Sequence, residues 1–154
     1  MADVYDTYLG VARDKFGAVL DSARSLDGKS FQSLATGTIV LGVGASLGGF
    51  EGADTPSLVF LFLAATAFAC LAFFSYRATR VTLWSNRPDL DRLHQHLQDN
   101  AVSFDALRLW TAREYQYSVS ENTAPLRSKG NNTTVAIIAL SAEVMLLLVG
   151  VVLA

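Results

Sequence analysis

A glutamate in the middle of a hydrophobic run is the residue of this sequence best placed to carry chemistry. The run extends from Thr133 to Ala154 with no other ionisable side chain, and Glu143 is its eleventh residue. At 1.5 Å rise per residue, a helix places this carboxylate about 15 Å into the run, near the middle of a hydrocarbon layer roughly 30 Å thick. A charge at that depth costs about 2.5–3.5 kcal/mol on insertion scales. We therefore expect Glu143 to face protein or water and not lipid.

Three roles for this carboxylate are open on the sequence alone. In the first, copies of the chain converge so that Glu143, with Ser141 at similar depth, lines or gates an ion path. Three helices enclose no pore, so that role requires an oligomer. In the second role, a protonated Glu143 holds neighbouring helices together through hydrogen bonds. In the third, it is one step of a proton relay. The hydrophobic runs contain no Lys or Arg that could neutralise it.

Other patterns in the sequence do not support catalysis. The glycines of 42–49 imitate a dinucleotide-binding loop, but they lie within a hydrophobic run and follow no strand. The stretch Asp27–Ser30 matches the end of a phosphate-binding loop, yet alanine occupies position 23, where the loop requires glycine. His94 and His96 would point to opposite sides of a helix and cannot share a metal ion. We therefore expect no enzyme, no cofactor and no metal site.

Three hydrophobic runs organise the chain, in which 51% of residues are hydrophobic. They cover 31–50, 57–76 and 133–154, and each is long enough to cross a membrane as a helix. Of the basic residues, four precede the first run and eight lie between the second and third, whereas none lies in 51–56 or after the third run. The positive-inside rule then predicts a multi-pass membrane protein with a cytoplasmic N-terminus and an external C-terminus.

The segments outside these runs are predicted to be helical. Before the first run, apolar residues recur at steps of three and four, which indicates an amphipathic helix that packs on protein or on the membrane surface. A slight excess of acidic residues in it favours protein. Between the second and third runs we expect a helical hairpin. Its first helix begins at Pro88 and its second is capped by Ser103, and Pro125 and Gly130 then interrupt or bend the chain.

The predicted fold is thus an all-α membrane protein with three transmembrane helices, an N-terminal amphipathic helix and a cytoplasmic helical hairpin. The expected division is 1–30 for the amphipathic helix, 31–50 for the first span, 51–56 for an external loop, 57–76 for the second span, 77–132 for the cytoplasmic segment and 133–154 for the third span.

Small residues indicate where helices pack. Gly44 and Gly48 form a GxxxG pair in register with Gly37, and Ala65 and Ala69 share one face of the second run. Because small residues let helix backbones approach closely in lipid, we expect the glycine face to hold copies of the chain together in a homo-oligomer.

A mixed aromatic and basic surface is predicted on the second cytoplasmic helix. Aromatic side chains beside arginines suit contact with a protein or a nucleotide. The alternative is that the aromatic rings pack the hairpin against the N-terminal helix. The residues concerned are Arg108, Trp110, Arg113, Tyr115 and Tyr117.

The stretch from Tyr115 to Leu148 has Glu121–Asn122, Leu126 and Lys129 before a span with a mid-depth glutamate. In this it resembles small bacterial membrane effectors of anti-phage defence, namely the SLATT-like and Pycsar transmembrane groups and the Hailong transmembrane effector. Those effectors often pair two spans with a juxtamembrane helix, whereas three spans are expected here.

The resemblance implies an oligomeric inner-membrane effector that forms an ion-permeable channel or disrupts the membrane. Its trigger would be a nucleotidyltransferase- or cyclase-type partner, a cyclic nucleotide or a nucleic-acid signal. Two alternatives are a non-conducting scaffold that anchors a cytoplasmic partner and a small transporter subunit.

Overall fold

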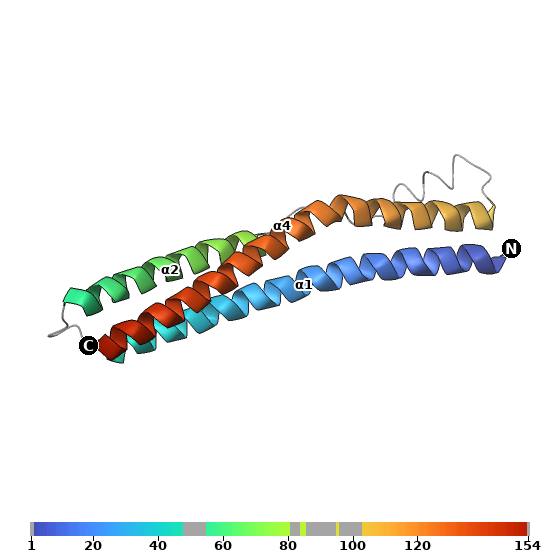
Figure 1. Ribbon diagram of the computed structural model, residues 1–154. Helices are drawn as coiled ribbons and strands as arrows, with labels where there is room; N and C mark the ends of the chain where they lie inside the picture. Colours follow the sequence, from blue (N-terminus) through green and yellow to red (C-terminus); the bar gives the residue numbers. More distant parts are fainter. Residues whose placement is uncertain (1, 48–54, 81–83, 86–94, 96–102, 154) are drawn as a thin grey trace. The chain divides into compact units, whose positions relative to one another are not determined.

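The computed structural model describes residues 2–47, 55–80, 84–85, 95 and 103–153. The described part of the chain is helical and contains no strand, which confirms the all-α class. Its helices are α1 (Ala2–Leu47), α2 (Thr55–Thr79) and α4 (Phe104–Leu153) (Figure 1).

Two of these helices continue through boundaries that the sequence predicted. α1 runs without a break through position 30, so the amphipathic segment and the described part of the first hydrophobic run form one helix of 46 residues. α4 likewise continues through Pro125 and Gly130, so these residues do not interrupt the helix, and the alternative expectation of a bend there stays a prediction. Pro125 removes one backbone donor, but hydrogen bonds on either side keep a long helix continuous. The expected boundary between 132 and 133 therefore falls inside α4.

The start of α4 agrees with the sequence prediction. The hydroxyl of Ser103 accepts a hydrogen bond from the backbone N–H of Ala106 at 3.3 Å, and its carbonyl accepts one from the N–H of Leu107 at 3.0 Å. These two bonds are what an N-cap serine makes, because the first N–H groups of a helix have no partner within it. The other helix of the expected hairpin, from Pro88, lies outside the described residues.

Contacts between Cα atoms group the chain into two units. The first unit comprises Met1–Arg24 and Val81–Arg127, and the second unit comprises Ser25–Arg80 and Ser128–Ala154. The first unit thus contains the N-terminal parts of α1 and α4. The second unit contains the C-terminal parts of α1 and α4 together with the whole of α2.

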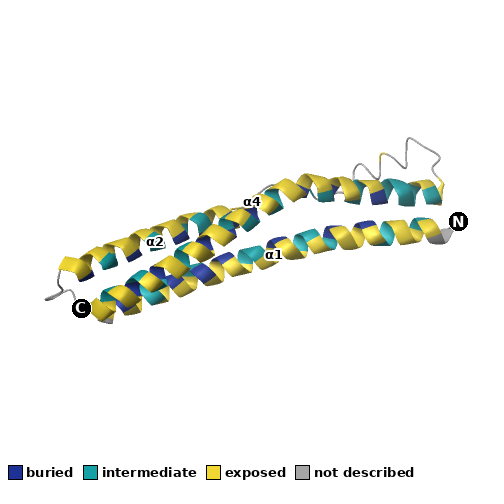
Figure 2. Ribbon diagram, in the orientation of Figure 1, coloured by how far each residue is buried: buried dark blue, intermediate teal, exposed yellow. Residues whose placement is uncertain are grey.

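Buried positions in the second unit follow one spacing on all three helices. They recur at alternating steps of three and four residues or at their sum, seven, which is the pattern of a coiled-coil seam (Figure 2). Each helix therefore turns one narrow stripe toward the other two. The buried residues are Ser30, Ser33, Gly37 and Gly44 on α1, Ser57, Ala64, Leu71, Ser75 and Ala78 on α2, and Lys129, Thr133, Ala136, Glu143 and Leu147 on α4.

Two helices are long and apolar enough to cross a membrane by length and composition. They are α2 and α4. Only 17% of the most apolar 18-residue stretch of α2, and 22% of that of α4, is buried within the chain. α1 does not meet the same test over its described residues, so a third span at 31–50 stays a prediction. Most of the apolar surface of α2 and α4 consequently faces outward.

Candidate functional site

Glu143 lies at the centre of the second unit, enclosed by all three helices. Its exposed fraction is 0%. A Cβ atom placed on Gly37 of α1 would lie 2.9 Å from Oε2 of Glu143 and 2.3 Å from Cδ2 of Leu71 on α2. Only a residue without a side chain leaves this space for the carboxylate and the leucine. The glutamate thus faces the interior of its own chain, whereas the sequence predicted only that it faces protein or water and not lipid.

The carboxylate of Glu143 has no hydrogen-bond partner among the described residues. Both Oε1 and Oε2 are buried and unpaired. A buried charge without a partner is strongly unfavourable, and even a neutral carboxyl group loses free energy when its polar atoms are left unsatisfied. The site therefore calls for a proton, a water molecule or a further polar group at this position.

Ser141 does not share the site with Glu143. Its side chain is exposed and donates a hydrogen bond to the carbonyl of Ile137 at 3.0 Å. Residues two apart on a helix point in different directions, so Ser141 faces outward where Glu143 faces inward. Within one chain the two side chains do not line one path, and a shared path in an oligomer stays a prediction.

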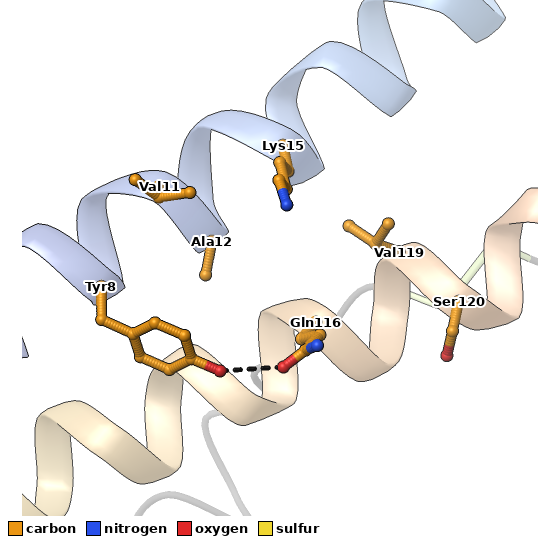
Figure 3. A pocket seen from close by; sticks show the side chains of 7 residues that line it. All are labelled: Tyr8, Val11, Ala12, Lys15, Gln116, Val119 and Ser120. Carbon is orange, nitrogen blue, oxygen red and sulfur yellow. Dashed lines mark hydrogen bonds between the residues drawn. The ribbon is translucent and has the colours of Figure 1, made fainter.

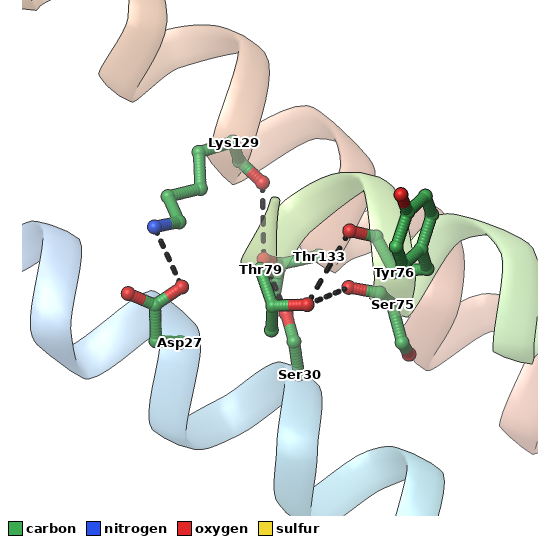
Figure 4. Close-up of polar contacts among 7 residues, drawn as sticks. All are labelled: Asp27, Ser30, Ser75, Tyr76, Thr79, Lys129 and Thr133. Carbon is green, nitrogen blue, oxygen red and sulfur yellow. Dashed lines mark hydrogen bonds and ion pairs between the residues drawn. The ribbon is translucent and has the colours of Figure 1, made fainter. Parts of the chain in front are cut away.

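Other polar side chains, which the sequence analysis did not single out, share the seam with Glu143. Nζ of Lys129 lies 2.6 Å from Oδ1 of Asp27, and the lysine is almost fully buried (Figure 4). One turn further along α4, Thr133 Oγ1 lies 2.9 Å from Ser30 Oγ. Thr133 Oγ1 also donates to the carbonyl of Lys129 at 3.0 Å, so Ser30 is the donor to Thr133.

Two more buried serines lie between this cluster and Glu143. Ser33 is one turn from Gly37 on α1, and Ser75 is one turn from Leu71 on α2. Ser75 is 1% exposed, and its hydroxyl has no hydrogen-bond partner in the described structure. The heptad spacing of these serines is visible in the sequence and would have indicated that they share one seam with Glu143.

Two residues of the predicted glycine face, Gly37 and Gly44, pack against other helices of the same chain. A Cβ on Gly44 would lie 2.8 Å from Cδ2 of Leu147. The space beside Gly37 is filled by the side chains of Leu71 and Glu143. These two glycines contact their own chain, and the expectation that the glycine face holds separate copies together stays a prediction. Gly48 lies outside the described residues. Ala65 and Ala69 are exposed and make no packing face within the chain, where α2 instead buries Ala64 and Leu71.

In the first unit, two of the predicted contact residues hold α1 and α4 together. Nε of Arg108 lies 3.1 Å from Oδ1 of Asp6, and its guanidinium carbon lies 4.1 Å from the centre of the Phe104 ring. The ring of Tyr115 packs on Phe16 with centroids 5.6 Å apart. For Tyr115 the alternative interpretation, in which an aromatic ring packs against the N-terminal helix, is confirmed. The amphipathic part of α1 accordingly packs on protein.

The remaining predicted contact residues differ in exposure. Trp110 is half-buried, whereas Arg113 and Tyr117 are exposed. A pocket opens between α1 and α4 of this unit, and across it Tyr8 donates a hydrogen bond to Oε1 of Gln116 at 2.9 Å (Figure 3). Arg113 and Tyr117 do not line that pocket. They remain the candidate surface for a partner.

No protein-family profile matches this sequence, and searches of curated proteins and of solved structures also found no match. The described residues contain no group of three or more His, Cys, Asp or Glu side chains that could hold a metal ion. The fold and the site therefore define an all-helical protein with an enclosed carboxylate on a coiled-coil seam.

Proposed function

We propose that this chain is an inner-membrane effector of bacterial anti-phage defence whose second unit lies in the lipid bilayer. On receiving a cytoplasmic signal, the second unit makes the membrane permeable to ions. The observation that carries the membrane part is the inverted distribution of side chains in the second unit. Large apolar residues point outward, and Ser, Thr, Lys and Glu point inward. In water an apolar surface of this extent would cause association, whereas in lipid it is the expected exterior.

The outward-facing hydroxyl groups of the second unit allow the same placement. Thr38, Thr66 and Ser141 are exposed, and each donates to a backbone carbonyl four residues earlier, at 2.9, 2.9 and 3.0 Å. Hydrogen bonds of this kind satisfy a hydroxyl without water, which is what a lipid-facing position requires.

The proposal includes α1 as a third span. From Ser30 to Leu47, α1 has no charged residue, and its seam packs on α2 and α4. The charged residues of the described second unit, Glu143 apart, all belong to one end of the bundle, and that end is mostly basic. This supports its placement at the cytoplasmic surface. These residues are Asp27, Lys29, Arg77, Arg80 and Lys129.

Permeation in this proposal requires a rearrangement and several copies. Because Glu143 is enclosed by one chain, an ion path lined by it forms only after the seam opens and copies associate. The outward small residues Ala65 and Ala69 offer one surface for such an association. The resemblance to defence effectors supports a trigger from a nucleotidyltransferase- or cyclase-type partner or from a cyclic nucleotide. The exposed Arg113 and Tyr117 would receive it.

The test is potassium efflux from liposomes that contain the purified protein, measured with and without added cyclic nucleotides. We expect efflux from the wild-type protein and altered ion selectivity or loss of efflux in Glu143→Gln, which keeps the shape of the side chain and removes the charge. Liposomes with correctly inserted protein that stay sealed under every condition would contradict the permeation role.

A second candidate is a non-conducting anchor for a cytoplasmic partner. The close packing of Gly37 against Glu143 and Leu71 favours it, since a tight seam resists opening. An anchor would recruit its partner to membranes through the first unit and leave liposomes sealed. Glu143→Gln would then change neither property.

A further inference from the structure

We infer that Glu143 is a proton-binding site that is supplied with water from one end of the second unit only. The water molecules would lie along the buried polar residues, from the Asp27–Lys129 pair, past Ser30 and Thr133, to the glutamate. This inference deepens the proposed function, because it assigns the ligand of the enclosed carboxylate. It rests on geometry within the second unit.

The positions of these residues form an ordered series. Lys129, Thr133, Ala136 and Glu143 follow in that order along the seam of α4, and Ser30, Ser33 and Gly37 follow in the same direction on α1, where Ser33 supplies a hydroxyl at the level of the apolar Ala136. α2 runs the opposite way, since Leu71 lies beside Gly37 and Phe60 lies beside Gly150. Leu71 and Glu143 lie at the same height in the bundle. Ser75 is one turn further along α2, toward the end of the bundle that contains Lys129.

Three unsatisfied polar atoms lie at the inner end of this series, and Ser57 Oγ, far from them on the other side of Glu143, is also unpaired. Ser75 Oγ and both carboxylate oxygens of Glu143 are buried and have no partner among the described residues. Buried polar groups in proteins are normally paired with protein or with ordered water. Water molecules between Ser33, Ser75 and Glu143 would satisfy all of these atoms.

The opposite side of Glu143 is apolar. There the seam is made by Gly44, Ala64 and Leu147, and Leu147 fills the space beside Gly44. The buried hydroxyl on that side, Ser57, lies two heptads from Leu71 on α2. An apolar seam does not hold water, so the carboxylate has polar access from the Lys129 end and not from the other.

Proton binding follows from this environment. A hydronium ion on the water chain gives its proton to the carboxylate and leaves water and a neutral carboxyl group, and the reverse step returns the proton to the same side. α1 and α2 present Gly37 and Leu71 to Glu143, and neither carries charge. The nearest charged groups along the seam are Asp27 and Lys129, which pair with each other at 2.6 Å. Lys29, Arg77 and Arg80 belong to that same end.

The experiment follows the carboxyl group of Glu143 by infrared spectroscopy on the full-length protein in detergent. The protonated-carboxyl band is assigned by its loss in Glu143→Gln, and its shift is timed after transfer to D₂O. Ser33→Ala with Ser75→Ala removes the two inner hydroxyls and should slow the shift on the order of tenfold, because waters there lose hydrogen-bond partners. Thr133→Val, which keeps the side-chain shape, should slow it in the same direction.

Ser57→Ala is the matched control, since Ser57 is a buried serine of α2 on the other side of Glu143. It should exchange at the wild-type rate. Equal slowing by Ser57→Ala, or wild-type exchange in both the serine pair and Thr133→Val, would overturn the one-sided path. Absence of any band that Glu143→Gln removes, throughout the pH range of the folded protein, would overturn the proton site. Because the readout needs no membrane leak, these failures are distinct from sealed liposomes.

Discussion

The two units share α1 and α4 but distribute polarity along α1 in opposite ways. In the first unit α1 buries Ala12, Phe16 and Ala23 and turns charged residues outward. In the second unit α1 buries Ser30 and Ser33 and exposes Ile39, which is 66% accessible. The heptad spacing sets which faces of the helices meet, whereas the outward residues determine whether water or lipid surrounds them.

Buried polar groups also differ between the two units. In the first unit, Asn122 is 1% exposed, and its side chain accepts from the N–H of Ser85 at 2.9 Å and donates to the carbonyl of Ser85 at 3.0 Å. In the second unit, Glu143 is equally buried and unpaired. A satisfied amide fixes a structure, whereas an unsatisfied carboxylate at the same kind of position points to a site that binds something.

The largest effect is expected at Gly37. Gly37→Leu forces a side chain into the space of Leu71 and Glu143 and should destabilise the second unit by about 3 kcal/mol or more, because overpacking displaces side chains on all three helices. Gly42 is the matched control on the same helix, since a Cβ there meets no atom within 4 Å. Thermal unfolding in detergent should show a large loss for Gly37→Leu and little change for Gly42→Leu. Equal stabilities would contradict the packing of the seam.

A smaller effect is expected at Asn122 in the first unit. Asn122→Ala leaves the backbone groups of Ser85 without partners and should cost about 1–3 kcal/mol of unfolding free energy. Thr123→Ala, at the neighbouring exposed position, is the control and should cost well under this amount. Denaturant titration measures both. A loss in the control as large as in Asn122→Ala would show that the hydrogen bonds to Ser85 are not the cause.

The smallest effect on stability is expected at Arg108 and Arg113 of the first unit. Arg108→Glu breaks the ion pair with Asp6 and should cost about 0.2–1 kcal/mol. Arg113→Glu alters only an exposed side chain and should leave stability unchanged while it weakens the response to the trigger. Triggered potassium efflux and unfolding, measured on both single variants, separate the two roles. An unchanged trigger response in a well-inserted Arg113→Glu protein would exclude this surface.

The sequence predicted the features that depend on local chemistry. The N-cap at Ser103 and the direction of Glu143 away from lipid each follow from one residue and its neighbours. The helical class follows from the spacing of apolar residues along short segments. The pairing of Ser30 with Thr133 could not be predicted the same way, because 103 residues separate them and only the register of three helices brings them together. The contacts of Gly37 and Gly44 within their own chain could not be predicted for the same reason. Small residues predict close approach but not whether the approaching helix belongs to the same chain.

The central claim is that lipid surrounds the second unit, including its part of α1. Its most direct test is labelling of single cysteines with a membrane-impermeant maleimide in membrane vesicles, in a Cys70→Ala background. Ile39→Cys on α1 and Phe62→Cys on α2 replace outward-facing residues of the second unit, and Val11→Cys replaces an outward-facing residue of the first. The account predicts that Val11→Cys reacts in permeabilised vesicles, whereas Ile39→Cys and Phe62→Cys react only after denaturation. Reaction of Ile39→Cys as fast as that of Val11→Cys would contradict the account.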